Sequence, residues 1–139
     1  MKVVWSTLLL LALLPSGCAT PPIQLRPENV TVVMARGSDP RTGVTGIGEV
    51  FTQEGKIVAH MTFRWDDISK TGGRQSVEAK WYSGERLIGK KVIDVPFDTP
   101  PYHVWFDASA IDFSQGPARF EAYNRGVLLV SKTFEIISK

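Results

Sequence analysis

The chain is poor in the residues from which disulfides and most metal sites are built. Its 139 residues include one cysteine, Cys18, and two histidines, His60 and His103. One cysteine cannot form a disulfide within the chain, and zinc sites need Cys and His ligands clustered at short spacing. We therefore expect a domain without a disulfide, without a metal site and without a cofactor.

A charge excess and a long apolar run are also missing. The 16 basic residues nearly balance the 14 acidic ones, and no block of like charges occurs. This balance argues against nucleic acid as the main partner. The apolar run over residues 3–14 is about 12 residues long, whereas a helix needs roughly 20 residues to span the hydrocarbon of a bilayer. The run is therefore too short for a retained membrane helix.

What the chain does contain is an N-terminal targeting signal. Lys2 supplies a positive start, residues 3–14 are apolar, and the small residues Ser16 and Gly17 precede Cys18. This order is typical of a secretory signal peptide, here covering residues 1–17.

The residues around the expected cleavage site resemble the lipobox of bacterial lipoproteins: Leu14, Ser16, Gly17 and Cys18, with Pro15 where Leu is the norm. The resemblance implies that Cys18 is lipidated and becomes the new N-terminus, which would anchor the protein in a membrane. Ala19 after the cysteine resembles the signal for sorting to the outer membrane, with the domain facing the periplasm. Cleavage after Ala19 is the alternative, and it would discard Cys18 and release a soluble protein.

Residues 18–28 follow the signal and hold three prolines, which favour an extended chain. We expect a tether here. At about 3.1 Å per residue, it would hold the domain some 30 Å from the bilayer surface.

From residue 29 onward, apolar and polar residues alternate with the period of two that is typical of strands with one buried face. Gly- and Pro-rich turns separate these runs, and Asn124-Arg125-Gly126 predicts a tight hairpin. About seven strands are expected, over residues 30–36, 57–65, 77–81, 87–95 (with a break at Gly89), 102–108, 118–122 and 127–137.

This spacing predicts an all-β fold, and residues 29–139 resemble an Ig-like domain. The segment 77–88 is similar to a central Ig strand with Trp81 in the core, and 116–126 with the following strand is similar to the last hairpin. The fold class that we predict is a single Ig-like antiparallel β-sandwich of about seven strands, without a disulfide.

Residues that would carry catalysis are few. The carboxylates lie scattered near strand ends, and no spacing singles out an acid–base pair. Asp66 and Asp67 lack the alternating oxygen ligands of a calcium loop. The glycines of segment 43–48 are not followed by a helix that could hold a phosphate, so they predict a mobile loop. We therefore expect no enzyme.

Aromatic side chains are the stronger candidates. Trp105 and Tyr82 lie on the polar faces of their strands, and exposed Trp and Tyr are typical of interfaces and sugar-binding surfaces. A covering loop or sheet edge is the alternative explanation. We take as candidate partner-binding residues Trp105, Tyr82, Tyr123 and Arg64, with Asp39 and Arg41 at a loop tip; Lys80 and Arg119 join them if their strands are neighbours.

The resulting hypothesis is a lipid-anchored, non-catalytic binding or assembly module that docks a protein partner in the cell envelope, such as part of a secretion, pilus or polymer-export machine. Two alternatives remain open: an inhibitor of a hydrolase such as lysozyme, and a glycan-binding module.

Overall fold

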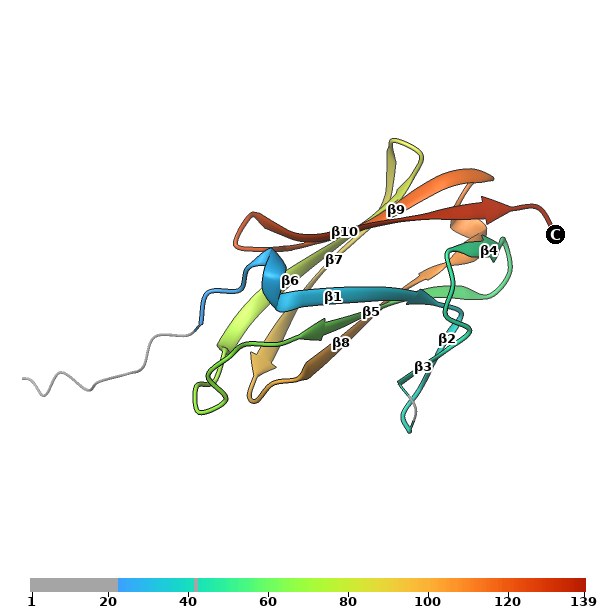
Figure 1. The fold of residues 1–139 in the computed structure, drawn as a ribbon. Coiled ribbons are helices and arrows are strands. Elements are labelled where there is room, and N and C mark those ends of the chain that lie inside the picture. Colours follow the sequence, from blue (N-terminus) through green and yellow to red (C-terminus); the bar gives the residue numbers. More distant parts are fainter. Residues whose placement is uncertain (1–22, 42) are drawn as a thin grey trace, which may run out of the picture.

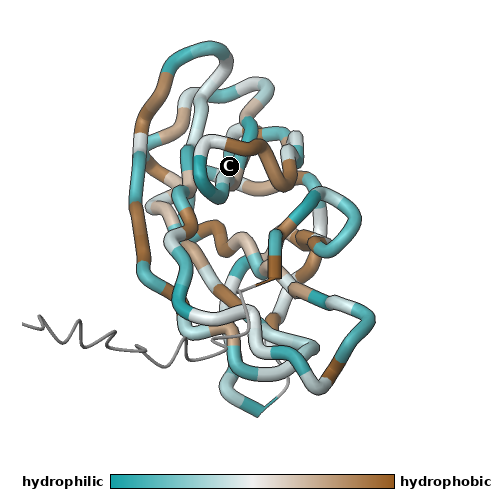
Figure 2. The backbone as a smooth tube through the Cα atoms, turned by 90° about the vertical axis from the view of Figure 1, so that its left-hand side faces the viewer, coloured by the Kyte–Doolittle hydropathy of each residue, from teal (hydrophilic) through white to brown (hydrophobic). Residues whose placement is uncertain are grey.

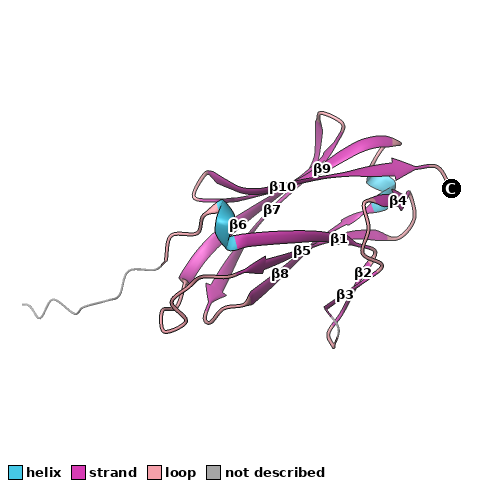
Figure 3. Cartoon of the chain, in the orientation of Figure 1, coloured by secondary structure: helices cyan, strands magenta, loops and turns pink. Residues whose placement is uncertain are grey.

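The computed structural model describes residues 23–41 and 43–139. The expected signal peptide and Cys18 therefore lie outside the described residues. Strands dominate the described part, and its helical elements are two short 3-10 turns, η1 (Pro27–Asn29) and η2 (Ala110–Asp112), as Figure 3 shows.

Two sheets pack face to face (Figure 1). The small sheet has the order β1-β5-β8, and the large sheet has the order β4-β10-β9-β6-β7. A two-stranded ribbon, β2-β3, projects from one end. The strands are β1 (Val30–Ala35), β2 (Gly37–Asp39), β3 (Gly43–Thr45), β4 (Val50–Thr52), β5 (Lys56–Phe63), β6 (Gly73–Ser83), β7 (Arg86–Phe97), β8 (Tyr102–Ser109), β9 (Gly116–Asn124) and β10 (Val127–Ile137).

The strand order is that of an Ig-like sandwich. β1, β5 and β8 correspond to Ig strands A, B and E, and β6, β7, β9 and β10 correspond to C, C′, F and G. All strand pairs are antiparallel except β4 with β10, where the chain crosses from the small sheet to the large one. The predicted fold class is thus confirmed.

The predicted number of strands was too small. All seven predicted strands are present, but β2, β3 and β4 bring the total in the described part of the chain to ten. Each of these three has only three residues, too few for an alternating pattern to stand out. The segment 43–48, predicted as a mobile loop, therefore contains β3. A break was predicted at Gly89, but β7 is continuous there. Trp81 pairs with Gly89 and Tyr82 with Leu87, so the register skips one residue of β7 and forms a bulge next to Gly89.

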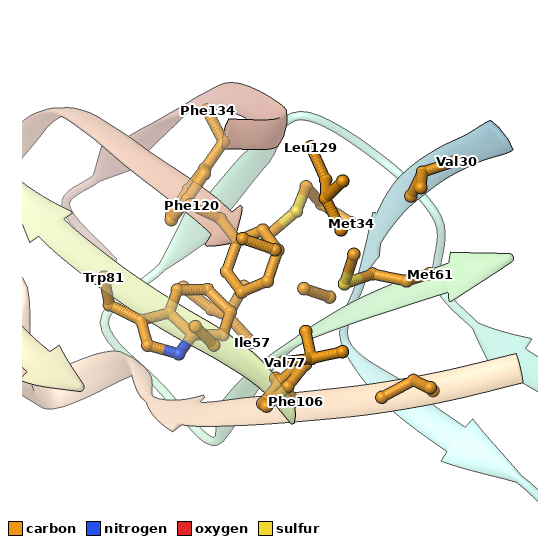
Figure 4. Close-up of a cluster of buried hydrophobic side chains, with 14 of the residues drawn as sticks. Val30, Met34, Ile57, Met61, Val77, Trp81, Phe106, Phe120, Leu129 and Phe134 are labelled. Carbon is orange, nitrogen blue, oxygen red and sulfur yellow. The ribbon is translucent and has the colours of Figure 1, made fainter. Parts of the chain in front are cut away.

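Alternation along the strands builds one core between the sheets (Figure 4). From the small sheet, Ile57, Met61 and Phe106 point inward, and they are at most 2% exposed. They meet Trp81 and Phe120 of the large sheet, whose ring centroids are 4.7 Å apart. Burial of side chains of this size contributes about 1.5–3 kcal/mol each, so the core holds the two sheets together without a disulfide.

The packed body begins before residue 29, within the segment predicted as tether. Leu25 is 2% exposed and belongs to the core, and Ile23 packs against it. The Gln75 side chain donates a hydrogen bond to the Ile23 carbonyl oxygen at 2.8 Å. The described part of the tether is therefore attached to the domain and does not act as a spacer.

Candidate functional site

The outer face of the small sheet carries a cluster of three rings: His60, His103 and Trp105, called here the ring cluster. His60 lies opposite Trp105 in the β5–β8 pairing, and His103 lies one outward position along β8. The imidazole of His60 stacks on the indole of Trp105 with centroids 5.0 Å apart and planes 6° apart. The centroids of His60 and His103 are also 5.0 Å apart, with planes 27° apart. Because each ring packs on the others, the indole is held in one orientation while Trp105 stays 45% exposed.

A hydrogen bond links the two imidazoles. The distance between His60 Nε2 and His103 Nδ1 is 2.9 Å, and Thr62 Oγ1 lies 3.3 Å from the same His103 nitrogen. Partial burial, and then the neighbouring His103, lower the pKa of His60. The cluster therefore favours a neutral His60. Its Nε2 donates to or accepts from His103 Nδ1, depending on which tautomer is present.

The β2–β3 ribbon lies beside this cluster. A Cβ built on Gly43 would lie 4.0 Å from Cε1 of His60, and the φ of +92° at this position favours glycine. The ribbon packs against β5, and the outward-facing Ala35 and Val58 are at most 1% exposed. It thus covers one end of the small sheet's outer face.

Between the ribbon and the ring cluster is a hollow of about 420 Å³. It is lined by Ser38, Asp39, Pro40, Gly43 and Trp105. The backbone N–H of Arg41 donates to Asp39 Oδ1 at 2.7 Å, which shapes the ribbon tip. The structure therefore brings Asp39 and Trp105 to one hollow, although they are 66 positions apart in the sequence.

The outer face of the large sheet carries a second cluster, called here the tyrosine cluster: Tyr82, Lys80, Arg119, Glu121 and Tyr123. β6 and β9 are neighbours, and Tyr82 lies opposite Arg119 while Lys80 lies opposite Glu121. The Arg119 guanidinium lies 4.3 Å from the centre of the Tyr82 ring, and Lys80 Nζ lies 4.8 Å from the centre of the Tyr123 ring. Both tyrosines are half-buried beneath these cations.

Glu121 holds the tyrosine cluster together. Arg119 Nε donates to Glu121 Oε1 at 2.6 Å, and the Tyr123 hydroxyl donates to Glu121 Oε2. Burial acts to raise the pKa of Glu121, but the hydrogen bonds from Tyr123 and Arg119 outweigh it and lower that pKa. The bond to Glu121, together with burial, raises the pKa of Tyr123 to about 12. The Glu121 carboxylate and the Tyr123 hydroxyl are thus paired with each other.

Arg64 belongs to neither cluster. It follows β5, and its backbone N–H donates to the Asn29 carbonyl oxygen at 2.8 Å. A hollow of about 610 Å³ lies beside it, with Trp65, Pro100 and Pro101 in its wall. The structure places Lys80 and Arg119 on the paired strands β6 and β9, as expected for neighbouring strands, but Arg64 follows a strand of the other sheet and does not share their surface. The predicted binding residues therefore occupy three separate places.

Sequence reasoning missed the histidines of the ring cluster. From the sequence, His60 and His103 served only to argue against a zinc site, and neither of them was assigned to a binding surface. Both share the outward parity of Trp105 on strands that pair with each other. That parity was visible in the sequence, but the pairing of β5 with β8 was not.

Among the described residues, no group of three or more His, Cys, Asp or Glu side chains is placed to hold a metal ion. Within residues 23–41 and 43–139 there is also no helix with the length and apolar character needed to cross a membrane.

No protein-family model matches the chain, and no curated protein matches it. Among solved structures, an immunoglobulin-like protein from Pseudomonas aeruginosa is 9% identical, with a TM-score of 0.48, over 77% of this chain and 97% of that chain. The alkylpurine DNA glycosylase AlkC from Pseudomonas fluorescens is 14% identical, with a TM-score of 0.48, over 78% of this chain and 30% of that chain.

A β-glucosidase from Erythrobacter marinus is 10% identical, with a TM-score of 0.46, over 78% of this chain and 16% of that chain. The matched part is thus a small fraction of each of the two enzymes. At these identities and scores the likenesses carry no conclusion about function, and the Ig-like assignment rests on the strand order of the chain itself.

Proposed function

We propose that this protein is a non-catalytic binding module of the bacterial outer membrane, anchored through a lipid on Cys18 and facing the periplasm. It docks a protein of the cell envelope through the ring cluster and the adjoining hollow. The observation that carries the proposal is the half-exposed indole of Trp105, which His60 and His103 hold in place beside the ribbon tip.

A fixed, exposed indole suits a docking surface. It buries a large area on binding, and it loses little side-chain entropy because its rotamer is already set by the stack on His60. The hollow beside it accepts a partner side chain, and the ribbon tip adds polar atoms at the rim. An apolar centre with a polar rim is the usual arrangement of energetically important interface residues.

The tyrosine cluster is a poorer docking surface. Its cations already cover the tyrosine rings, and Glu121 is only 8% exposed and accepts bonds from two neighbours. A partner would have to displace these contacts before it could make its own. We therefore assign the cluster to the stability of the sheet.

The proposal is tested by photo-crosslinking in intact cells. The crosslinking amino acid benzoylphenylalanine replaces exposed Asp107, which lies two positions from Trp105 on the same face. The matched control replaces exposed Ser131 on the outer face of the large sheet. We expect one discrete adduct from position 107, its loss when Trp105→Ala is added, and none from position 131. An equal yield at 107 with and without Trp105 would refute the proposal.

Glycan binding is a second candidate, because an exposed indole beside polar groups also suits a sugar ring. Titration of peptidoglycan fragments into the protein tests it through tryptophan fluorescence. A change that disappears in Trp105→Phe would favour a glycan, and a flat trace would remove this candidate.

The inhibitor alternative is tested by the activity of lysozyme in the presence of excess protein, with Trp105→Ala as the control. Undiminished lysozyme activity would remove this alternative.

A further inference from the structure

The packing of residues 23–29 decides how far the domain lies from its anchor. Leu25 is inserted into the core, and the Asn29 side chain donates to the Arg64 carbonyl oxygen at 2.9 Å. The Gln75 side-chain amide donates to the carbonyl oxygens of Gly72, at 2.6 Å, and Ile23, at 2.8 Å, and the second bond fixes the start of the described chain. The part of the chain that is fixed to the domain therefore begins no later than Ile23, five positions after Cys18.

The number of residue steps limits the distance from Cys18 to Ile23. Five residue steps reach at most about 18 Å when fully extended. This is well below the distance of about 30 Å that a tether over residues 18–28 would provide. If Cys18 carries the lipid, as the proposed function requires, Ile23 and the surfaces beside it lie within this reach of the bilayer.

One end of the sandwich surrounds Ile23. The start of β1, the turn between β9 and β10, and the loop between β5 and β6 gather at the end where the described chain begins (Figure 1). Figure 2 looks onto this end of the molecule. The ribbon β2–β3 and strand β4 lie at the opposite end.

The loop between β5 and β6 presents an apolar side chain at this end. Ile68 is 75% exposed, although the loop around it is well ordered by hydrogen bonds. Asp67 Oδ1 accepts bonds from Ser69 N at 3.1 Å and Ser69 Oγ at 2.5 Å, and Trp65 Nε1 donates to the Lys70 carbonyl oxygen at 2.8 Å. The loop therefore holds Ile68 outward instead of letting it fold onto the core.

The turn between β9 and β10 adds Val127 and Leu128, which are 47% and 43% exposed. The charges near this end balance in sign. Arg26 pairs with Glu28, Lys70 with Asp67 and Arg74 with Asp94, while Arg64 and Arg125 are matched in number by Asp66 and Asp98. An end with three exposed apolar side chains and a net charge near zero, next to the anchor, matches the chemistry of a lipid surface better than that of a charged partner.

We infer that this end of the sandwich rests on the bilayer, with Ile68 entering the boundary between headgroups and acyl chains. The inference rests on the lipidation of Cys18 that belongs to the proposed function. A single isoleucine binds a membrane weakly, but the anchor keeps it at a high effective concentration next to the surface. The strands then point away from the membrane, and the β2–β3 ribbon faces the periplasm.

The test uses the full-length, lipidated protein in vesicles of phosphatidylethanolamine and phosphatidylglycerol. Ile68→Cys carries an environment-sensitive NBD label, and Ile47→Cys is the matched control at the opposite end, where Ile47 is 65% exposed. Cys18 does not react with the label once its sulfur carries the diacylglyceryl group as a thioether. We expect a blue shift of the label at position 68 and its quenching by nitroxide lipids, with neither effect at position 47.

Flotation of the vesicles separates the two proposals. Protein that floats while the label at position 68 emits as in water would overturn the membrane contact and leave the anchor intact. Protein that does not float would overturn the anchor and the contact together. In a second variant the label is at Val127→Cys, and added Ile68→Asp should reduce its blue shift; an unchanged shift would show that Ile68 does not support the contact.

Discussion

The two outer faces of the sandwich use aromatic side chains in opposite ways. On the large sheet, cations cover Tyr82 and Tyr123, and Glu121 accepts bonds from two sides. On the small sheet, His60 and His103 support Trp105 from beside it and leave 45% of it exposed. In the tyrosine cluster, Glu121 is paired with neighbours inside the cluster, whereas the ring cluster leaves apolar area of the indole exposed, which a binding partner could cover.

The difference shows that an aromatic residue on the polar face of a strand is not enough to identify a binding surface. Tyr82 and Trp105 had the same sequence signal. Their neighbours on the adjacent strand, Arg119 for Tyr82 and His60 for Trp105, give them different properties.

The largest expected effect concerns binding. Trp105→Ala should weaken the affinity for the crosslinked partner by about 2 kcal/mol, or roughly 30-fold, as is typical of a central interface tryptophan. Tyr82→Ala should change it less than about threefold, because its ring is already covered. Titration of the purified partner with each variant measures both values. Equal losses for the two variants would erase the proposed distinction between the faces.

The second effect concerns stability, where we expect a larger loss from the tyrosine cluster than from Trp105. Glu121→Ala should lower the free energy of unfolding by about 1–3 kcal/mol, because it leaves the Tyr123 hydroxyl and Arg119 without their acceptor in a largely buried position. Trp105→Ala should cost about 1 kcal/mol or less, since the side chain is half-exposed. Urea unfolding of both variants measures the difference, and a greater loss in Trp105→Ala would contradict it.

The third effect depends on pH. Because burial and His103 lower the pKa of His60 in the folded state, the unfolded chain binds the proton more readily. Stability is therefore complete above the ordinary histidine pKa of about 6.5 and falls as the pH drops below it. His60→Phe keeps a ring in the stack and should flatten this fall in unfolding experiments.

Glu121→Gln is the matched control for that experiment. The lowered pKa of the wild-type Glu121 carboxyl stabilises the fold above about pH 4.3, so the contribution of Glu121 is lost only at lower pH. An unchanged slope below pH 6.5 in His60→Phe would mean that the imidazole does not act as described.

The smallest effect is spectroscopic. Tyr123 should ionise near pH 12, because Glu121 and burial favour its protonated form. Phenolate absorbance during an alkaline titration should show this late step, which Tyr123→Phe removes and Glu121→Gln moves to lower pH. A late step that survives in Tyr123→Phe would assign it to another tyrosine.

The sequence predicted much of the fold and little of the site. The alternation over β5, β6, β8 and β9 was sufficient to place Ile57, Trp81 and Phe120 in the core. It was not sufficient for the strands β2 to β4, which are too short to show a period, or for Leu25, which lies in a short proline-rich stretch. Asp39 was a reasonable candidate, but its position beside Trp105 depends on how the ribbon folds back.

The buried face of each long strand follows from the order of residues alone, because side chains on a strand alternate and the apolar ones leave water. Which outward side chains meet follows only from the folded chain, because cross-strand neighbours depend on pairing and register between distant segments. For the same reason, the chain order could not reveal that the Ile23 carbonyl oxygen accepts a hydrogen bond from Gln75, the contact on which the proposed position of Ile68 at a membrane rests.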